Sequence, residues 1–387
     1  MQNRYSSYCY NQIVYFYCVY IRKFRGNFQK FLESMEISET TRGGKILFDA
    51  NDPSQLYGLR CAERLFIAVA YELVDRCMNK RQLFDKLFST LDSIPALVSM
   101  FQEAITCLHR EQSVNSVCRC FRVSLKTTGK WRFRINNERL SASLARRVKQ
   151  ITGFNTSLRS AALEVCIHIS EESIFIGIPI TREPLSKRPY LFNNSLRSTV
   201  ADALLSLANI QDGDIVADFT CGSSSILLQA AHDFRQKIFL LGFDCSWDAL
   251  ELSSKNINYL RQSDKTEPVI NLLANNIFND SFKYEVVDHI ISDLPFGQMY
   301  GTEESAIKIL QRVCDIFSNC AIGIDRSNCC CNSTAILLIS AAHLALLDKM
   351  LKAPVRLQRY YPISLGITDA VIVLLTTDTA SSSANHN

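Results

Sequence analysis

The chain has 387 residues, of which 47% are hydrophobic, and a formal net charge of +4. This composition excludes a disordered or repetitive protein and predicts two or three domains with substantial cores. No apolar window approaches the ~18 residues that a membrane span needs, and the aromatic N-terminus lacks the residue order of a signal peptide, so we expect an intracellular protein. The fifteen cysteines are then expected to be buried thiols, and since their spacing does not fit a structural zinc site, we predict no metal.

Charge is distributed unevenly along the chain. Residues 1–190 contain 28 lysines and arginines against 17 aspartates and glutamates, a net charge of +11, whereas residues 191–387 carry −7. Residues 110–149 alone contain 11 basic and 2 acidic side chains. This asymmetry predicts a front half that binds a polyanion; the alternative is a solvated basic face without a partner.

The first half has the mixed periodicity of an α+β region. It ends in a connection rich in Pro, Arg and Lys at 179–190, which we predict to be the domain boundary. The predicted elements are, in chain order, a strand at 12–21, a helix end, Gly-Gly turn and strand within 33–50, helices at 55–73, 83–91 and 94–109, a strand at 116–126, a helix at 141–154, and strands at 164–170 and 173–180.

The second half alternates apolar strands with amphipathic helices. Strands that are apolar on both faces predict a parallel, doubly wound sheet. Two final strands, 355–366 and 369–377, have no helix between them and fit an antiparallel hairpin at its edge, and 378–387 is expected to be a disordered tail. The remaining predictions are strands at 214–219, 238–244, 269–275, 287–294 and 334–340, and helices at 223–233, 246–262, 303–319 and 342–352.

Two of these strands end in residues that can hold a ligand, since ligands of such sheets bind beyond the carboxyl ends of the strands. Asp218 is followed by a Cys-Gly-Ser loop and a helix, which directs backbone N–H groups at a bound group; a serine-capped helix is the alternative. Asp244 ends the next strand and can accept both hydroxyls of a ribose; its alternative is an N-cap.

A third strand ends in the sequence HIISDLPFG, residues 289–297. Pro295 makes the turn rigid and leaves carbonyl groups free. Phe296 offers a face to a planar base, while Asp293 and the Leu294 carbonyl can accept hydrogen bonds from an exocyclic amine. The alternative is a tight turn with a capping Asp and a core Phe.

Together the three strand ends have the layout of amino-group methyltransferases that use S-adenosylmethionine, and the chain resembles the THUMP-domain RNA guanine-N2-methyltransferases. The likeness extends from about residue 15 to residue 375. It implies a Rossmann-like class I methyltransferase domain at 191–377, preceded by an α+β, ferredoxin-like and THUMP-containing RNA-binding region at 1–190. It rests on GGKIL at 43–47, CAERLFIAVA at 61–70, VCRCFRVS at 117–124, GIPITREPLSKRPYL at 177–191, LRSTVADALLSLA at 196–208 and the two strand-end motifs.

The resemblance assigns residues to the cofactor and to the target base. Phe219 and Ser224 depart from the family, which has proline and glycine there; a Cβ at Ser224 would bring a side chain close to the cofactor. The target guanine is implied to lie against Asp293, Leu294, Pro295 and Phe296. The implied S-adenosylmethionine site consists of Asp218, Cys221, Gly222, Ser224, Asp244, Asn276, Arg197, Ser198 and Thr199.

The resemblance also implies an RNA partner, a tRNA or a spliceosomal small nuclear RNA, and a small zinc-binding activator subunit, in the nucleus or the cytoplasm. Three other functions stay open: an RNA-binding protein with a degenerate pocket, a nicotinamide dehydrogenase, disfavoured by the missing GxGxxG, and a protein-glutamine or DNA-adenine methyltransferase. The expected RNA-binding residues are Arg119, Arg122, Lys126, Lys130, Arg132, Arg134, Arg146 and Arg147.

Overall fold

The chain forms two compact units, and the division between them falls between Leu185 and Ser186. The predicted strand at 12–21, the predicted tail and Arg119 lie outside the residues that the structure describes. The computed structural model describes residues 39–42, 45–48, 62–94, 97–110, 120–185, 187–188, 191, 195–234, 237–264, 269–279, 283–297, 301–322, 333–365 and 368–377.

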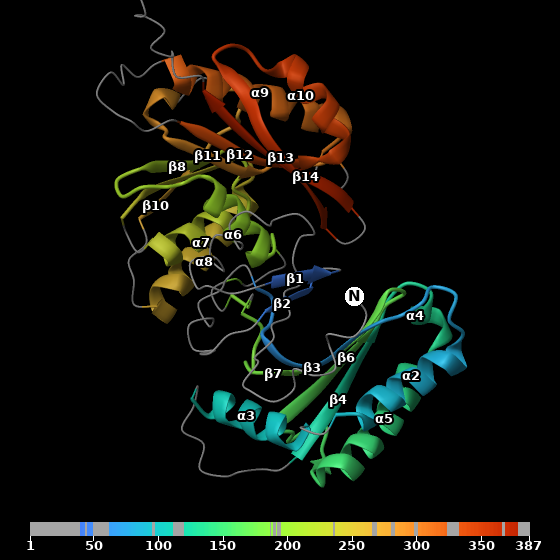
Figure 1. Cartoon of the computed structure of the whole chain (residues 1–387). Helices are drawn as coiled ribbons and strands as arrows, with labels where there is room; N and C mark the ends of the chain where they lie inside the picture. The colour runs from blue at the N-terminus through green and yellow to red at the C-terminus, as the bar shows by residue number, and fades with distance from the viewer. Residues whose placement is uncertain are drawn as a thin grey trace, which may run out of the picture. The chain divides into compact units, whose positions relative to one another are not determined.

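The first unit is built on a five-stranded sheet of order β3-β7-β6-β4-β5 (Figure 1). Strand β7 pairs antiparallel with β3 and β6, whereas β4 pairs parallel with β6 and β5. Helices α3 and α5 pack against this sheet, and Phe101 meets Phe121 and Phe154 edge to face in the core between them. The elements of this unit are β1 Glu39–Arg42, β2 Lys45–Phe48, β3 Phe66–Leu73, α2 Lys80–Asp92, α3 Leu97–Arg110, β4 Cys120–Thr127, α4 Trp131–Arg134, α5 Asn137–Thr152, β5 Asn155–Thr156, β6 Leu163–Ile169 and β7 Ser173–Pro179.

The helix predicted at 55–73 is wrong, because Phe66–Leu73 is strand β3. Phe66, Ile67 and Ala68 are all buried. A short run of residues that is buried on both faces has the same apolar signal in a helix and in a strand. Its β-branched and aromatic residues favour a strand, and the run pairs antiparallel with β7 at the edge of the sheet.

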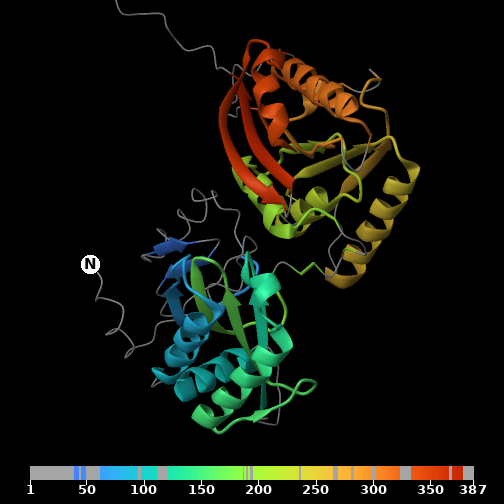
Figure 2. The same ribbon diagram turned by 90° about the vertical axis from the view of Figure 1, so that its right-hand side faces the viewer.

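The second unit contains a seven-stranded sheet of order β10-β9-β8-β11-β12-β14-β13, with helices on both faces (Figures 1 and 2). The strands from β10 to β12 are parallel, and β14 runs antiparallel to β12 and β13. The predicted doubly wound sheet with an antiparallel edge hairpin is therefore confirmed. The elements are α6 Ser198–Leu207, β8 Ile215–Asp218, α7 Ser225–Phe234, β9 Phe239–Asp244, α8 Trp247–Asp264, β10 Ile270–Ala274, η2 Tyr284–Val286, β11 His289–Asp293, α9 Glu303–Ile322, β12 Thr334–Ser340, η3 Ala341–His343, α10 Leu344–Met350, β13 Val355–Leu365 and β14 Thr368–Thr377.

The chain order of the parallel strands places one reversal of direction in the middle of the sheet. From β8 the chain moves outward to β9 and β10, and it then returns to the other side of β8 as β11 and continues to β12. The carboxyl ends of β8 and β11 therefore flank the switch point at which such sheets bind ligands.

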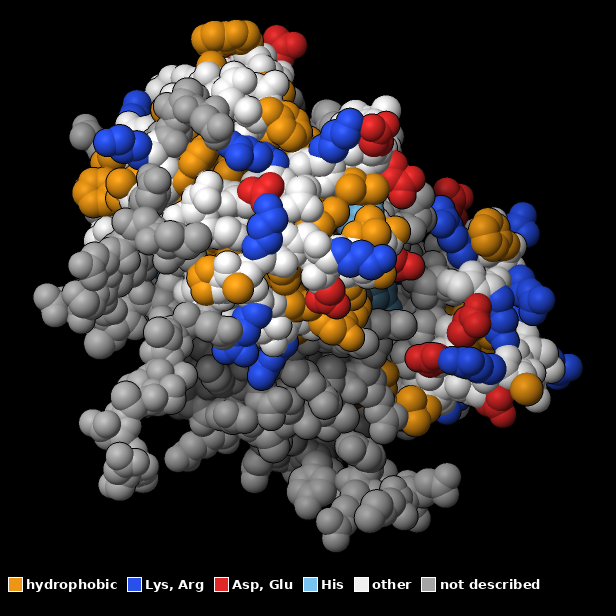
Figure 3. Space-filling model, turned by 90° about the horizontal axis from the view of Figure 1, so that it is seen from above, with side chains coloured by type: hydrophobic (Ala, Val, Ile, Leu, Met, Phe, Trp, Pro, Cys, Tyr) orange, Lys and Arg blue, Asp and Glu red, His pale blue; other side chains and the backbone are white. Residues whose placement is uncertain are grey.

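On the face drawn in Figure 3, lysine and arginine side chains are interspersed with acidic ones and with separate apolar patches. Among the described residues, no helix combines the length and the apolar character needed to cross a membrane.

Candidate active site

Three carboxylates lie at neighbouring strand ends on one edge of the second sheet. Asp244, Asp218 and Asp293 end β9, β8 and β11, which are adjacent and parallel. The hydroxyl of Thr220 donates a hydrogen bond of 3.2 Å to the Asp293 carbonyl oxygen. The loop after β8 and the corner after β11 are therefore in direct contact.

Ser292 joins these two strand ends from within the sheet. Its side chain is fully buried; the hydroxyl donates to the Asp218 carboxylate at 2.8 Å and accepts from the Phe219 N–H at 3.1 Å. Ser292 could not be selected from the sequence alone, because a serine inside an apolar strand has no local signature. Only the pairing of two segments far apart in the chain reveals its role.

The environment of Asp218 and Asp293 disfavours their charged forms. Burial raises the pKa of Asp218 to about 7, against the hydrogen bonds from Ser292 and the Thr220 N–H, and the nearby Asp293 and Asp244 charges raise it further. Burial alone raises the pKa of Asp293 to about 7. Both groups therefore change protonation near neutral pH, which is typical of carboxylates in functional sites.

Asp293 differs from the other two acids in its hydrogen bonding. Among the described residues, no group donates a hydrogen bond to its carboxylate, and none donates to the Leu294 carbonyl oxygen, whereas the Leu294 N–H bonds to the Leu338 carbonyl at 3.0 Å. Pro295 and Phe296 follow and are half-buried. Two acceptors without donors thus lie side by side on a corner held by its backbone, next to a half-exposed ring.

The loop after β8 wraps around the end of β9. Asp244 accepts the Gly222 N–H and the Ser246 N–H, each at 2.9 Å and on different oxygens, and the Cys221 N–H bonds to the Phe243 carbonyl at 2.9 Å. The N-cap role weighed for Asp244 falls instead to Ser246, whose hydroxyl accepts the Ala249 N–H. Each Asp244 oxygen keeps a lone pair for a further donor.

Gly222 has a left-handed backbone, with φ of 52°. Among the described residues other than its two chain neighbours, no atom lies within 4 Å of the place where a Cβ would stand, so the loop is open on that side.

Both departures from the family pattern are accommodated by the fold. Ser224 has φ of 61° and is fully buried, with its hydroxyl bonded to the hydroxyl of Ser253 on α8. The Ser224 side chain is thus held against α8. The Phe219 ring stacks on Phe243 with centroids 4.9 Å apart and meets Tyr284 edge to face at 5.6 Å. It belongs to the core.

The remaining cofactor candidates occupy the surroundings of this edge. Ser198 and Thr199 are buried in the first turn of α6, and Arg197 is the exposed N-cap. Asn276 is exposed in the loop after β10, where its side chain accepts the Phe278 N–H at 3.1 Å. None of these contacts by itself assigns a ligand.

Arg188, which the sequence did not single out, fixes the segment before α6. Its guanidinium donates to the Leu196 carbonyl and to the Ser225 carbonyl in the first turn of α7.

The predicted RNA-binding side chains of the first unit differ in how they are engaged. Arg122 pairs with Glu164 at 3.4 Å and Arg147 with Asp92 at 2.6 Å. Three candidates have side chains that make neither an ion pair nor a hydrogen bond among the described residues. The exposed candidates of this kind are Lys126, Arg132 and Arg134. Of the other two, Arg146 bonds to the Ser143 hydroxyl at 3.3 Å, and the Lys130 ammonium to the Arg76 carbonyl.

Comparisons with known proteins relate the second half of the chain to methyltransferases. Residues 186–356 match the family model described as RMKL-like, methyltransferase domain. The U6 snRNA (guanine-N(2))-methyltransferase THUMPD2 of Mus musculus is 32% identical over 193 residues, which are 50% of this chain and 36% of that protein. The tRNA (guanine(6)-N(2))-methyltransferase THUMP3 of Homo sapiens is 25% identical over 210 residues, 50% of this chain and 41% of that protein. The matched region of this chain thus covers less than half of the length of either relative.

Solved structures share the fold over nearly the whole chain. TrmN from Thermus thermophilus has a TM-score of 0.67 at 18% identity and covers 93% of this chain and 98% of its own. The SMU.472 structure, determined in complex with SAH, has a TM-score of 0.68 at 14% identity and covers 96% and 100%. The class I methyltransferase fold is confirmed, and so is the likeness to guanine-N2 RNA methyltransferases.

Proposed function

We propose that this chain, with an RMKL-like methyltransferase domain in its second half, is an S-adenosylmethionine-dependent enzyme that forms N2-methylguanosine in a structured RNA. The observation that carries the proposal is the Asp293–Leu294 corner. Its two acceptors lack donors among the described residues, and it contacts the loop after β8 through Thr220. The relatives' printed substrates, U6 snRNA and tRNA, supply the class of substrate.

The loop after β8 fits S-adenosylmethionine. The open space over Gly222 leaves room for a ligand against the backbone. The buried Asp218 carboxylate suits a cationic amino group, and Asp244 has lone pairs left for ribose hydroxyls. When bound, this cofactor supplies an electrophilic methyl group on a sulfonium. Ser198, Thr199 and Asn276 are proposed to complete the site.

The residues after β11 orient the target amine. The lone pair of guanine N2 is delocalised into the ring, so the amine is a weak nucleophile. The Asp293 carboxylate and the Leu294 carbonyl accept one hydrogen bond each from the two N–H groups of the amine. These bonds turn the nitrogen lone pair out of conjugation, while Phe296 supports the base from one face. Positioning of this kind supplies several kcal/mol, and an ionised Asp293 stabilises the positive charge that develops on nitrogen. The proton then leaves to Asp293 or to water.

The target guanosine must leave its stack to reach this corner, at a cost of a few kcal/mol, which favours a loop or a bulge in the RNA. We further propose that the first unit is a THUMP-containing region that binds RNA through its excess of positive charge. A small zinc-binding activator subunit, docked on an edge strand of the second sheet, and a nuclear or cytoplasmic location complete the proposal; both rest on the resemblance alone.

The test is the Asp293→Ala variant, assayed for transfer of tritiated methyl groups to RNA and for N2-methylguanosine by nucleoside mass spectrometry. We expect transfer to be abolished while RNA binding stays within about twofold, since the Asp293 carboxylate accepts no hydrogen bond from the described residues and its backbone contacts remain in the variant. Glu304→Ala is the matched control, because Glu304 is exposed and, within the described part of the chain, forms an ion pair only with Lys308 of its own helix. Equal activity of Asp293→Ala and the parent chain would refute the assignment.

A second function, RNA binding with a degenerate pocket, was suggested by Ser224 and Phe219. The buried positions of both side chains weigh against it, because the Ser224 hydroxyl bonds to Ser253 and the Phe219 ring packs on Phe243 and Tyr284. Calorimetric titration with S-adenosylmethionine decides between the two, since a degenerate pocket binds none.

A further inference from the structure

The short helix α4, Trp131–Arg134, presents an aromatic ring to solvent. Phe133 is 87% exposed, whereas Trp131 two residues earlier is fully buried. A single exposed apolar side chain is common on protein surfaces, so its exposure alone does not indicate a partner. The surroundings of the Phe133 ring are what indicate one, and of which kind.

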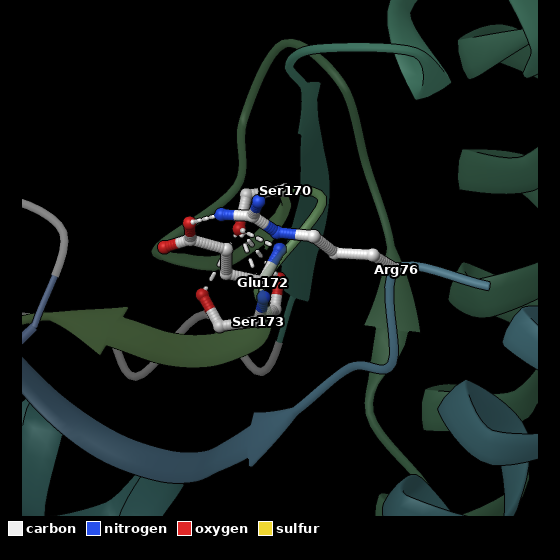
Figure 4. A network of polar contacts seen from close by, with 4 residues as sticks. All are labelled: Arg76, Ser170, Glu172 and Ser173. Carbon is white, nitrogen blue, oxygen red and sulfur yellow. Dashed lines mark hydrogen bonds and ion pairs between the residues drawn. The ribbon is translucent and has the colours of Figure 1, made fainter. Parts of the chain in front are cut away.

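Helix α4 is held firmly in place. Trp131 anchors it in the core, and the Lys130 N–H at its start donates to the Glu171 carboxylate at 2.6 Å. Glu171 belongs to the turn between β6 and β7. Figure 4 shows how this turn is braced: Arg76 pairs with Glu172 at 2.5 Å, and the Ser173 N–H bonds to the Ser170 hydroxyl at 2.9 Å. Phe133 thus extends from a rigid base.

Positive charge flanks the ring on both sides. Arg132 and Arg134 are exposed, and the Arg132 guanidinium lies 5.8 Å from the centre of the Phe133 ring. Neither arginine pairs with an acid among the described residues, in contrast to Arg122 and Arg147. An exposed ring with one guanidinium beside it and a second exposed arginine next in the chain, neither paired with an acid among the described residues, matches a phosphate backbone with an unstacked base. An apolar protein surface would leave both charges without a counterpart.

We infer that Phe133 stacks on an unpaired base of the RNA, while Arg132 and Arg134 contact the phosphates beside it. This inference rests on the proposed function, since it requires that the chain binds RNA. It goes beyond that proposal by naming an uncharged contact, which the excess of positive charge in the first unit does not predict. Stacking has no dependence on ion release, so its loss and the loss of a phosphate contact have different signatures.

The experiment measures fluorescence anisotropy of a fluorescein-labelled 12-nucleotide single-stranded RNA, and of the same length as duplex, titrated with the full chain at several salt concentrations. Phe133→Ala and Phe133→Leu should weaken single-strand binding about tenfold with an unchanged salt slope. Phe133→Trp, which keeps an aromatic ring, should retain the single-strand affinity of the parent chain. The Arg132→Gln and Arg134→Gln variants should each reduce the salt slope by roughly 0.7. Leu158→Ala is the matched control, because Leu158 is 82% exposed in the same unit without a role in the inference.

Two results overturn the inference, and they are distinguishable from failure of the proposed function. If the parent chain binds the single strand and Phe133→Ala binds it equally well, the ring serves another partner, such as a protein. If Phe133→Leu retains full binding, the contact is apolar rather than stacked. A parent chain that binds neither RNA contradicts the proposed function itself, and the inference with it.

Discussion

Replacing Ser253 of α8 by alanine tests how the loop after β8 tolerates a serine at residue 224. The two hydroxyls bond to each other, and both side chains are fully buried. Removal of one buried partner costs about 1–3 kcal/mol. The Ser224 N–H also bonds to the Cys221 carbonyl at 2.7 Å and helps to hold the loop, so the loss should fall near 1–2 kcal/mol, at the lower end of that range. The hydroxyl of Ser224, released from α8, can then turn toward the open side of the loop.

Two measurements follow this change. Native-state hydrogen exchange at the amides of α7 and α8 reports the free energy of unfolding of the second unit separately from the first, and calorimetry reports the affinity for S-adenosylmethionine. We expect both to fall in Ser253→Ala. Adding Ser224→Gly removes the unpaired hydroxyl and the cost of φ at 61°, of about 1–2 kcal/mol, so the double variant should regain the affinity.

A double-mutant cycle isolates the coupling between the two serines. Asn256→Ala is a useful companion, because the Asn256 amide donates to the neighbouring Ser223 carbonyl at 3.1 Å and should also loosen the loop. If Ser253→Ala leaves both the exchange and the affinity unchanged, the hydroxyl pair does not hold the loop and the reasoning is wrong.

Two further predictions concern the corner after β11. Methyl transfer should rise with pH and level off above about 7, because burial raises the pKa of Asp293 to about 7 and only the ionised carboxylate carries the charge that stabilises the positive charge developing on nitrogen. A rate independent of pH between 5.5 and 8 (about ±0.3 log units) would exclude this role. Gly297→Ala should reduce methyl transfer at least about tenfold while RNA binding remains. The φ of Gly297 is 76°, and a Cβ there would lie 2.6 Å from the Glu303 backbone. The strained corner must therefore shift by more than the ~1 Å that catalytic positioning tolerates. Parallel assays of binding and transfer check it, and a fully active Gly297→Ala enzyme contradicts it.

The sequence predicted the second unit well and the first only in part, for a physical reason. Parallel strands are covered on both faces, so nearly continuous apolar runs marked all of them, and the intervening helices kept a clear period. In the first unit the run of β3 was equally apolar and was assigned to a helix, because nothing local separates a short buried strand from a buried helix. Helix α6, Ser198–Leu207, was not assigned at all, since seven of its ten residues are buried and leave no amphipathic pattern.

The site shows the same division between local and spatial information. Acids at strand ends could be selected because the carboxyl edge of a parallel sheet is set by the fold. Ser292 and Ser253 could not, since each acts on a residue that only the folded sheet or helix brings close. The departure at Ser224 looked unfavourable for the same reason: the partner that holds its hydroxyl lies on another helix.

The three acids at this edge differ in how many hydrogen bonds their carboxylates accept from the protein, and this difference separates their roles. Asp244 accepts two backbone N–H groups and Asp218 accepts one hydroxyl and one N–H, so both are held as parts of the cofactor loop. Asp293 accepts none from the described residues, and burial makes its charge unfavourable until a donor arrives. A carboxylate that is desolvated and lacks donors gains most from a ligand that brings N–H groups. The target amine is assigned to Asp293 because its charge is stabilised least by the protein, and not merely because three acids lie at this edge.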